Sequence, residues 1–275
     1  MNDIGYGWRG AQYRAVRADA GRADGDAGTD PWAAGIRTPR FVDIASGAPA
    51  PFATSASVTW DDDALYVALD AEEPFVTATS RHDGDLLFFE NDLELFIDGG
   101  DTYYELEVNA FGTRYEVFYI WRDAPQAQEL LQDPRFDVHA PTAHTFGGDH
   151  ERTASSFWTG NHPRGTRWAF LDYRLRDLHI DVAVDGEIND PAHVDRGWSV
   201  RLRIPWDSLS DLAGTRSLPP REGDTWRMFF GRFEQLATRA PGVNIGLGWA
   251  ANPHGLNDTH IPEAWTNVTF VSGAA

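Results

Sequence analysis

The stretch ENDLELFIDGGDTYYELEVNAFG, residues 90–112, decides the fold because apolar and acidic side chains alternate on both sides of a Gly-Gly pair. Successive side chains of a strand point to opposite faces, so the pattern predicts a hairpin with a leucine-rich face and an acidic face. A turn at Gly99–Gly100 would set Leu93 opposite Leu106 and Glu94 opposite Glu105. A slip of one residue would place acids against core leucines, so hydrophobic patterning fixes which side chains share a face.

The acidic face of this hairpin carries Asp92, Glu94, Glu105 and Glu107. Like-charge cross-strand pairs cost a few tenths to about 1 kcal/mol each, so another group should offset them. The candidates are arginines from neighbouring strands, a calcium ion, raised carboxyl pKa values, or a ligand that donates hydrogen bonds. Arg–Glu pairs that only brace the sheet are the structural alternative to a polar binding face. The arginines considered are Arg201, Arg203 and Arg232.

The composition of the whole chain agrees with a β fold. The 275 residues are 13% aromatic and include 26 Gly and 16 Pro, which favours an all-β antiparallel sandwich of jelly-roll or immunoglobulin-like type with short helices. The net charge of −19 argues against nucleic acid and anionic membrane surfaces as partners. The absence of cysteine excludes disulfides, thiolate metal sites and a cysteine nucleophile.

Alternating patterns elsewhere predict the other strands, and few segments look helical. Short helices are expected at 125–133 and 206–212. Strands are expected at 57–60, 64–71, 114–121, 178–186, 197–206, 224–235, 244–250 and 267–271.

The domain organisation that we expect is simple. Residues 1–30 read as a loosely ordered lead-in, and 31–275 as a single domain with a loop insertion at about 122–168. The N-terminus has arginines but no apolar segment, so a signal peptide is not expected. The protein would then be cytoplasmic as written, or secreted if a leader had been trimmed.

Several motifs, taken in order, resemble the carbohydrate-binding module family 9-like domains of the DOMON-like β-sandwich superfamily. They are ENDLELFID, YYELEVNAFGT, HPRGTRWAFLDYRL, VDGEINDPAHVDRGWSVRLRIPW and HIPEAWTNVTF, and the resemblance runs from about residue 13 to 272. It implies an antiparallel β-sandwich whose relatives bind sugars between aromatic rings. It also implies that some relatives bind structural calcium, for which Asp98 and Asp101 are the candidates here.

The resemblance also implies roles for individual residues. Glu94 matches an acid that contacts sugar hydroxyls, and Trp249 matches an aromatic residue that stacks on a sugar ring. Phe88 stands roughly where sugar-binding members have a second tryptophan, and Arg201 where relatives usually have glutamate. Together with the acidic face, this gives the expected ligand-binding set: Glu94, Glu105, Glu107, Asn109, Arg232, Trp249 and His260.

Binding of a mono- or oligosaccharide is therefore the expected function, and a carbohydrate-active enzyme is the alternative. Glu94 and Glu105 are the candidate catalytic carboxylates, because cross-strand acids can serve as an acid and nucleophile pair on a glycoside. Histidines of the insertion are candidate bases: His139, His144, His150 and His162. No HExxH motif, nucleophile elbow or phosphate loop is present. A haem site using Met228 and a structural role with a decayed sugar site are further alternatives.

Overall fold

The computed structural model describes residues 9–18, 30–125, 127–147, 162–237 and 244–273. The strands in these ranges are β1 (Gln12–Arg17), β2 (Val42–Asp43), β3 (Thr54–Trp60), β4 (Ala64–Glu72), β5 (Asp92–Asp98), β6 (Thr102–Val108), β7 (Arg114–Trp121), β8 (Ala143–Phe146), β9 (Arg167–Phe170), β10 (His179–Asp185), β11 (Gly197–Pro205), β12 (Thr225–Ala237), β13 (Asn244–Ala250) and β14 (Thr266–Val271). The helices are short: α1 (Ala127–Leu130), α2 (Ser210–Ala213), and the 3-10 turns η1 (Leu87–Phe89), η2 (Pro134–Phe136), η3 (Trp206–Leu209) and η4 (Pro262–Ala264). None of the described helices has the length and apolar composition needed to cross a bilayer.

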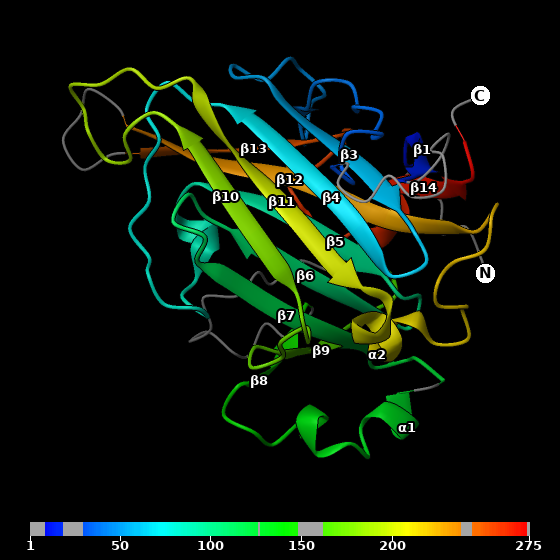
Figure 1. Cartoon of the computed structure of the whole chain (residues 1–275). Helices are drawn as coiled ribbons and strands as arrows, with labels where there is room; N and C mark the ends of the chain where they lie inside the picture. The colour runs from blue at the N-terminus through cyan, green and yellow to red at the C-terminus, as the bar shows by residue number, and fades with distance from the viewer. Residues whose placement is uncertain (1–8, 19–29, 126, 148–161, 238–243, 274–275) are drawn as a thin grey trace.

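One continuous path of paired strands folds into two layers. Its order is β10-β11-β4-β3-β1-β14-β12-β5-β6-β7-β9-β8, and β13 pairs with β12 and β2. Figure 1 shows β10, β11, β4 and β3 in front of β5, β6 and β7. Strand β1 runs parallel to β3 and β14, whereas the other ladders are antiparallel. The all-β sandwich expected from composition is confirmed, with this one parallel strand added.

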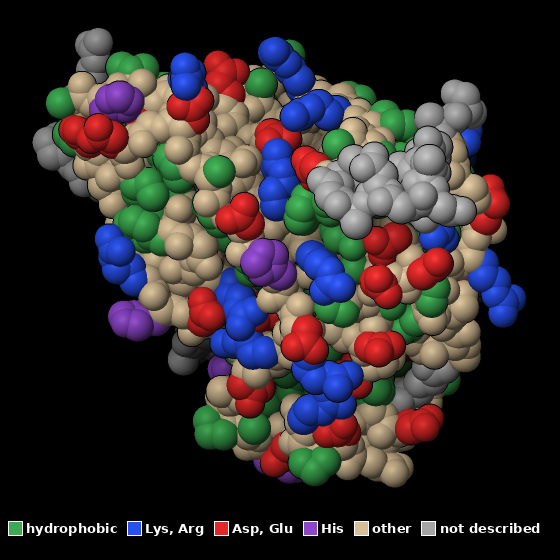
Figure 2. Space-filling model, viewed as in Figure 1, with side chains coloured by type: hydrophobic (Ala, Val, Ile, Leu, Met, Phe, Trp, Pro, Cys, Tyr) green, Lys and Arg blue, Asp and Glu red, His purple; other side chains and the backbone are tan. Residues whose placement is uncertain are grey.

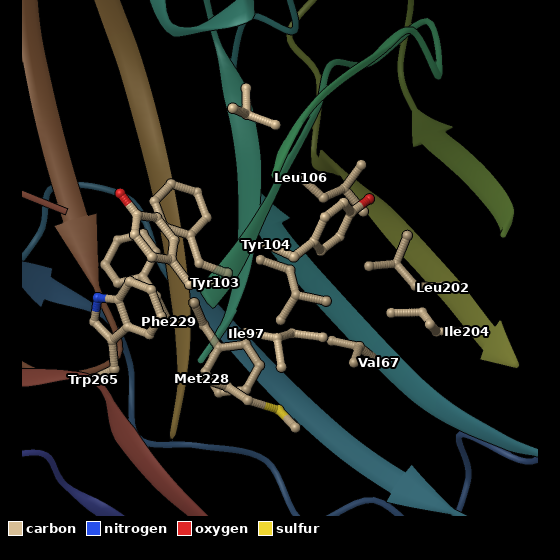
Figure 3. Close-up of a cluster of buried hydrophobic side chains, with 14 of the residues drawn as sticks. Val67, Ile97, Tyr103, Tyr104, Leu106, Leu202, Ile204, Met228, Phe229 and Trp265 are labelled. Atoms are coloured by element: carbon tan, nitrogen blue, oxygen red, sulfur yellow. The ribbon is translucent and has the colours of Figure 1, made fainter. Parts of the chain in front are cut away.

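The sandwich core fills the space between the two layers. Val67 and Leu202 of the front layer meet Tyr104 and Leu106 of the rear layer (Figure 3). These four side chains are at most 1% exposed. Figure 3 also shows Tyr103, Phe229 and Trp265 on the other side of β5 and β6. The rear layer is therefore covered by side chains on both faces, and the second face carries the candidate site. Met228 packs in the sandwich core at 0% exposure, which accounts for it without a haem.

The hairpin at residues 92–108 forms with the expected faces but in a register shifted by two residues. Leu93 lies opposite Val108, Leu95 opposite Leu106, and Glu94 opposite Glu107 rather than Glu105. A shift of two keeps every side chain on its predicted face, so the hydrophobic pattern alone does not resist it. The expected Leu93–Leu106 and Glu94–Glu105 pairs are therefore wrong, while the prediction of one acidic and one apolar face is confirmed.

The position of the turn explains this shift. The Gly99 N–H donates to the Thr102 carbonyl, which places Gly100 and Asp101 at the tip instead of Gly99 and Gly100. Gly100 takes the left-handed conformation with φ of 89°. Gly99 has a different role, because a Cβ there would lie 2.4 Å from the Leu212 carbonyl oxygen. One glycine permits the turn and the other permits the close approach of α2.

Two expected irregular regions contain strands. Gln12–Arg17, within the predicted lead-in, forms β1 between β3 and β14. The predicted insertion at about 122–168 contains α1, η2, β8 and the start of β9, and β8 pairs with β9 at the edge of the rear layer. The short helices expected at 125–133 and 206–212 are confirmed as α1 and as η3 with α2. Tertiary pairing, rather than local alternation, holds β1, β8 and β9 in place.

Candidate functional site

A cleft of about 300 Å³ opens on the face of the rear layer that points away from the front layer. Its floor is formed by side chains of β5, β6 and β7. They alternate along these strands with the residues of the sandwich core and therefore point to the opposite face. Its walls are aromatic, and its rim comes from the loop before η4. The lining residues are Glu94, Glu105, Glu107, Tyr115, Tyr119 and Phe233 from strands, and Phe88, Phe89, Phe146, Asn257, Asp258, Thr259 and His260 from the surrounding segments.

Carboxyl groups dominate the floor of this cleft. Glu94 and Glu107 line the cleft, and the buried Asp92 lies beside them, outside its lining. Each of these three residues offers an oxygen within 4.8 Å of the others, and the exposures of Asp92, Glu94 and Glu107 are 0%, 2% and 1%. One oxygen of each has no hydrogen-bond partner among the described residues. Burial raises the pKa of Glu94 well above its ordinary value, and the neighbouring Asp92 and Glu105 charges raise it further. Burial and nearby carboxyls act on the pKa of Asp92 and Glu107 in the same direction.

A buried hydrogen-bonded network supports one side of the floor. The Tyr119 hydroxyl donates to Glu105 at 2.5 Å, and Tyr119 stacks on Tyr103 with ring centroids 4.2 Å apart. The Tyr103 hydroxyl accepts from Arg167 Nε at 2.6 Å and lies 3.1 Å from His260 Nδ1. Burial, followed by the Arg167 charge, holds the pKa of His260 well below its ordinary value, so this imidazole is neutral.

Four of the predicted ligand-binding residues come together in the cleft: Glu94, Glu105, Glu107 and His260. Phe88 also lines it, beside Phe89, with ring centroids 4.4 Å apart. The two candidate catalytic carboxylates thus share the cleft. They do not face each other directly, because Glu105 lies opposite Phe96 in the hairpin.

Asn109 lies at the end of β6 but does not line the cleft, because its amide is used by the fold. Its Nδ2 donates to the Ser80 carbonyl and to Glu90, and its Oδ1 accepts from the N–H groups of Phe111 and Thr113. All its hydrogen-bonding positions are thereby occupied. The structure assigns it to closing the β6–β7 turn.

Arg232 and Trp249 lie on the other face of the rear layer. Arg232 is opposite Leu93 and Trp249 across neighbouring strands, so its side chain enters the sandwich interior with the leucines. Its guanidinium group pairs there with Glu73 and Glu234, and its Cζ atom lies 4.7 Å from the centroid of the Trp249 ring. Both side chains are at most 1% exposed. The expectation that they flank the acidic face is wrong, because strand alternation places them one residue out of phase with it.

The arginines expected to neutralise the acidic face are engaged elsewhere. Arg201 pairs with Asp70 at 2.7 Å on the front layer. The face seen in Figure 2, over β10, β11 and β4, carries arginines and acids in a mixed arrangement. Arg201 and Arg203 share a face, because half-buried positions alternate with buried ones along β11, and that face belongs to the front layer. Arg201 therefore does not offset the acids of the hairpin.

The calcium candidates at the hairpin turn are paired with arginines. Asp98 accepts from the Gly100 N–H at 2.8 Å and lies 3.4 Å from Arg227. Asp101 pairs with Arg164 at 2.9 Å. A cation already neutralises each carboxylate, so this arrangement does not favour calcium at the turn. The acidic floor of the cleft offers a better donor set.

The described histidines of the insertion do not form the walls of the cleft. His162 is buried and lies 3.1 Å from Glu263, and His139 is exposed beyond η2. His144 is in β8, and His150 lies outside the described residues. None of the three described histidines lines the cleft, whereas His260 does.

Sequence reasoning missed several residues of the site. Asp92 was placed on the acidic face but was not assigned to a site, and Tyr115 and Tyr119 were read only as part of a strand. Their alternation along 114–121 could have assigned them, because Tyr115 lies opposite Glu107. Arg167 and Phe146 lie in four-residue strands, which are too short to show a period.

A larger open hollow of about 600 Å³ lies over β3, β4, β10 and β11. Four of its charged groups form ion pairs: Arg196 pairs with Asp185 at 2.6 Å, and Arg37 with Asp70 at 2.8 Å. A ligand would have to break these pairs, whereas the smaller cleft offers buried oxygens without partners. The smaller cleft is therefore the candidate site.

No protein-family profile matches the sequence, and no similar sequence was found among curated proteins. Solved structures of a carbohydrate-binding module family 9 (CBM9) from Caldicellulosiruptor kristjanssonii are similar in three dimensions. The complex with cellotriose has a TM-score of 0.50 at 11% identity, over 97% of this chain and 95% of that one. This chain has a CBM9-like fold. The complex with glucose has a TM-score of 0.50 at 11% identity, over 96% of this chain and 97% of that one. The CBM9-like domain thus matches nearly the full length of both structures.

Proposed function

We propose that the cleft of the CBM9-like domain binds a neutral saccharide of one or two rings. The observation that carries this proposal is the floor of buried carboxyls beneath aromatic walls. A sugar presents hydroxyls that donate to carboxylates and C–H faces that pack on aromatic rings. The volume of about 300 Å³ is at the lower end of small-molecule pockets, which suits a short ligand. The fold shared with modules in complex with cellotriose and glucose supports the same ligand class.

The charge of the cleft narrows the kind of saccharide. Burial, followed by the charges of neighbouring carboxyls, raises the pKa values of Glu94 and Glu107. A uronic acid or sulfated sugar would bring a further negative charge into this field, so neutral sugars are favoured. Phe89 is 60% exposed at the edge of the cleft and supports the role of a stacking platform for the ring.

Replacing Glu94 by glutamine should weaken saccharide binding by roughly 10–100-fold, because an amide NH₂ then replaces one acceptor of the sugar hydroxyls. Phe89→Ala should weaken it through loss of the platform. Calorimetric titration with glucose, xylose, cellobiose and cellotriose, with glucuronate as the charged comparison, measures both effects. Glu187→Gln, the same chemical change at an exposed position outside the cleft, is the matched control.

The titrations should be run both with calcium and with a chelator, and the same samples should be analysed for cleaved products. Binding of a neutral saccharide that is lost in Glu94→Gln and kept in Glu187→Gln supports the proposal. Absence of heat for every sugar in both conditions would overturn it, and so would equal affinity in the two variants. Release of product by the parent protein, abolished in Glu94→Gln while binding persists, would assign the cleft to an enzyme instead.

A further inference from the structure

The floor of the cleft has the geometry of a cation site as well as that of a sugar site. Asp92 and Glu94 extend from β5 and Glu107 from β6, and one oxygen from each lies within 4.8 Å of the other two. Calcium binds oxygens at about 2.3–2.6 Å, so one ion can bridge oxygens up to about 4.6–5.2 Å apart. Three oxygens around one such ion lie up to about 4.5 Å apart, so small side-chain movements, without a change of backbone, let a single ion contact all three carboxylates.

A fourth oxygen near this triad also has no partner. The hydroxyl of Tyr115, a residue 1% exposed, makes no hydrogen bond to any described residue. Tyr115 lies opposite Glu107 on β7 and lines the same cleft. A buried hydroxyl without a partner in a structure otherwise rich in hydrogen bonds indicates a missing ligand or water. This observation is separate from the clustering of the carboxylates, because Tyr115 is a neutral residue whose hydroxyl lacks a partner in its own right.

The local structure holds the triad open rather than letting it collapse. Asp92 is fixed by one oxygen, which accepts the Phe233 N–H at 3.1 Å, while its second oxygen is left without a partner. Gly231 lies opposite Glu94, and a Cβ at that position would be 2.9 Å from Glu94 Oε2. The missing side chain leaves space for the carboxylate. Rigid strands therefore present the oxygens in a fixed array, as a preorganised ligand site requires.

No positive side chain among the described residues forms an ion pair with Asp92, Glu94 or Glu107. Arg232, one residue away from Gly231, points to the opposite face and binds Glu73 and Glu234. Arg167 donates to the Tyr103 hydroxyl instead. Buried charges are normally paired with another charge or coordinate a metal.

We infer that Asp92, Glu94 and Glu107 hold one hard divalent cation, best matched by Ca²⁺, with Tyr115 close to its coordination sphere. Oxygen-only donors favour calcium, magnesium or manganese over zinc and copper. The side of the triad that faces the cleft leaves further coordination positions for water or for hydroxyls of a bound ligand. The inference concerns metal binding alone and does not depend on the proposed sugar ligand.

The test is a titration of chelator-treated protein with Ca²⁺, Mg²⁺ and Mn²⁺ in the absence of saccharide, followed by calorimetry and by thermal unfolding. We expect one equivalent of Ca²⁺ to bind and to raise the midpoint of unfolding. Glu94→Gln and Glu107→Gln should each weaken Ca²⁺ binding by roughly 10–100-fold. Glu187→Gln should bind like the parent protein, since this side chain is exposed and outside the cleft.

The two glutamine variants also guard against misfolding, because each replaces a carboxyl by a group of the same shape. Folded variants that lose the ion support the site. No binding of any of the three ions at millimolar concentration would overturn it, as would unchanged Ca²⁺ affinity in both cleft variants. Saccharide titrations with and without the ion are separate readouts. Failure of metal binding therefore leaves the sugar proposal testable, and failure of sugar binding leaves the metal site standing.

Discussion

Replacing Arg232 by methionine should lower the free energy of unfolding by about 3–5 kcal/mol, because two buried carboxyls would lose their shared cation. Arg232 is 0% exposed and pairs with Glu73 and Glu234, both 2% exposed, within the sandwich. It also donates to the Thr54 hydroxyl at 3.1 Å and to the Glu72 carbonyl at 2.8 Å. Urea unfolding followed by tryptophan fluorescence measures the change.

Two further variants separate the lost charge from lost packing in the Arg232 experiment. Combining Arg232→Met with Glu73→Gln and Glu234→Gln should recover much of the stability, since replacing a whole buried ionic cluster is far less costly than removing one partner. Arg196→Met removes an arginine from an exposed pair with Asp185 and should have a much smaller effect. A triple variant as unstable as the single one would show that packing against Trp249, rather than charge, is the main contribution of Arg232.

The alternation of residues 90–112 was sufficient to predict which side chains of the hairpin share a face. Leu93, Leu95 and Leu106 are buried in the sandwich, and Glu94, Glu105 and Glu107 line the cleft, as the period of two requires. The register was not predictable from the same pattern, because a shift of two residues preserves every face. It depends on which residues form the turn, since the Gly99 N–H pairs with the Thr102 carbonyl and leaves Gly100 and Asp101 at the tip. The close approach of α2 to Gly99, a contact between segments more than one hundred residues apart, was not predictable either.

The placement of Arg232 and Trp249 shows why a site cannot be assembled from residue types alone. Both are of a kind that binds sugars, and both are within a few residues of Phe233, which does line the cleft. Alternation along β12 turns Arg232 inward and Phe233 outward. The alternation along β12 could be read from the sequence. Which of its two faces joins the acidic face of β5 could not, because that depends on the pairing of Gly231 with Glu94, which is a tertiary contact.

The aromatic wall residue Phe146 and the buried Arg167, which supports Tyr103 behind the cleft, were the least predictable parts. Phe146 and Arg167 belong to β8 and β9, where four residues give too little alternation to identify a strand. These strands exist because the edge of β7 offers them backbone partners, since Phe118 to Trp121 pair with Arg167 to Phe170. Local sequence carries little information about such an edge addition.

Ionisation of Glu73 should lower the free energy of unfolding of the metal-free protein by roughly 2–4 kcal/mol as the pH rises from about 5 to about 8.5. Burial, followed by the hydrogen bond and charge of Glu234, raises the pKa of Glu73 to about 8 from an ordinary value of 4.5. An acid with a raised pKa in the folded state keeps its full stabilising contribution below the unfolded pKa and loses it as the pH rises through the folded pKa. In physical terms, Glu73 is neutral beside Arg232 at low pH, whereas at high pH a second negative charge is buried next to Glu234 with a single arginine between them.

Glu73→Gln tests this assignment because it fixes the neutral state of that position at every pH. The variant should lose much of the decrease in stability between about pH 5 and about pH 8.5, while Glu187→Gln should keep the slope of the parent protein. Denaturant titrations at several pH values in the presence of a chelator give the slope directly. The raised pKa values of Asp92, Glu94 and Glu107 act in the same direction, so Glu73→Gln should flatten the profile without abolishing its slope. A Glu73→Gln profile with the same slope as that of the parent protein would contradict the assignment, because Glu73 would then contribute no difference in proton binding between the folded and unfolded states.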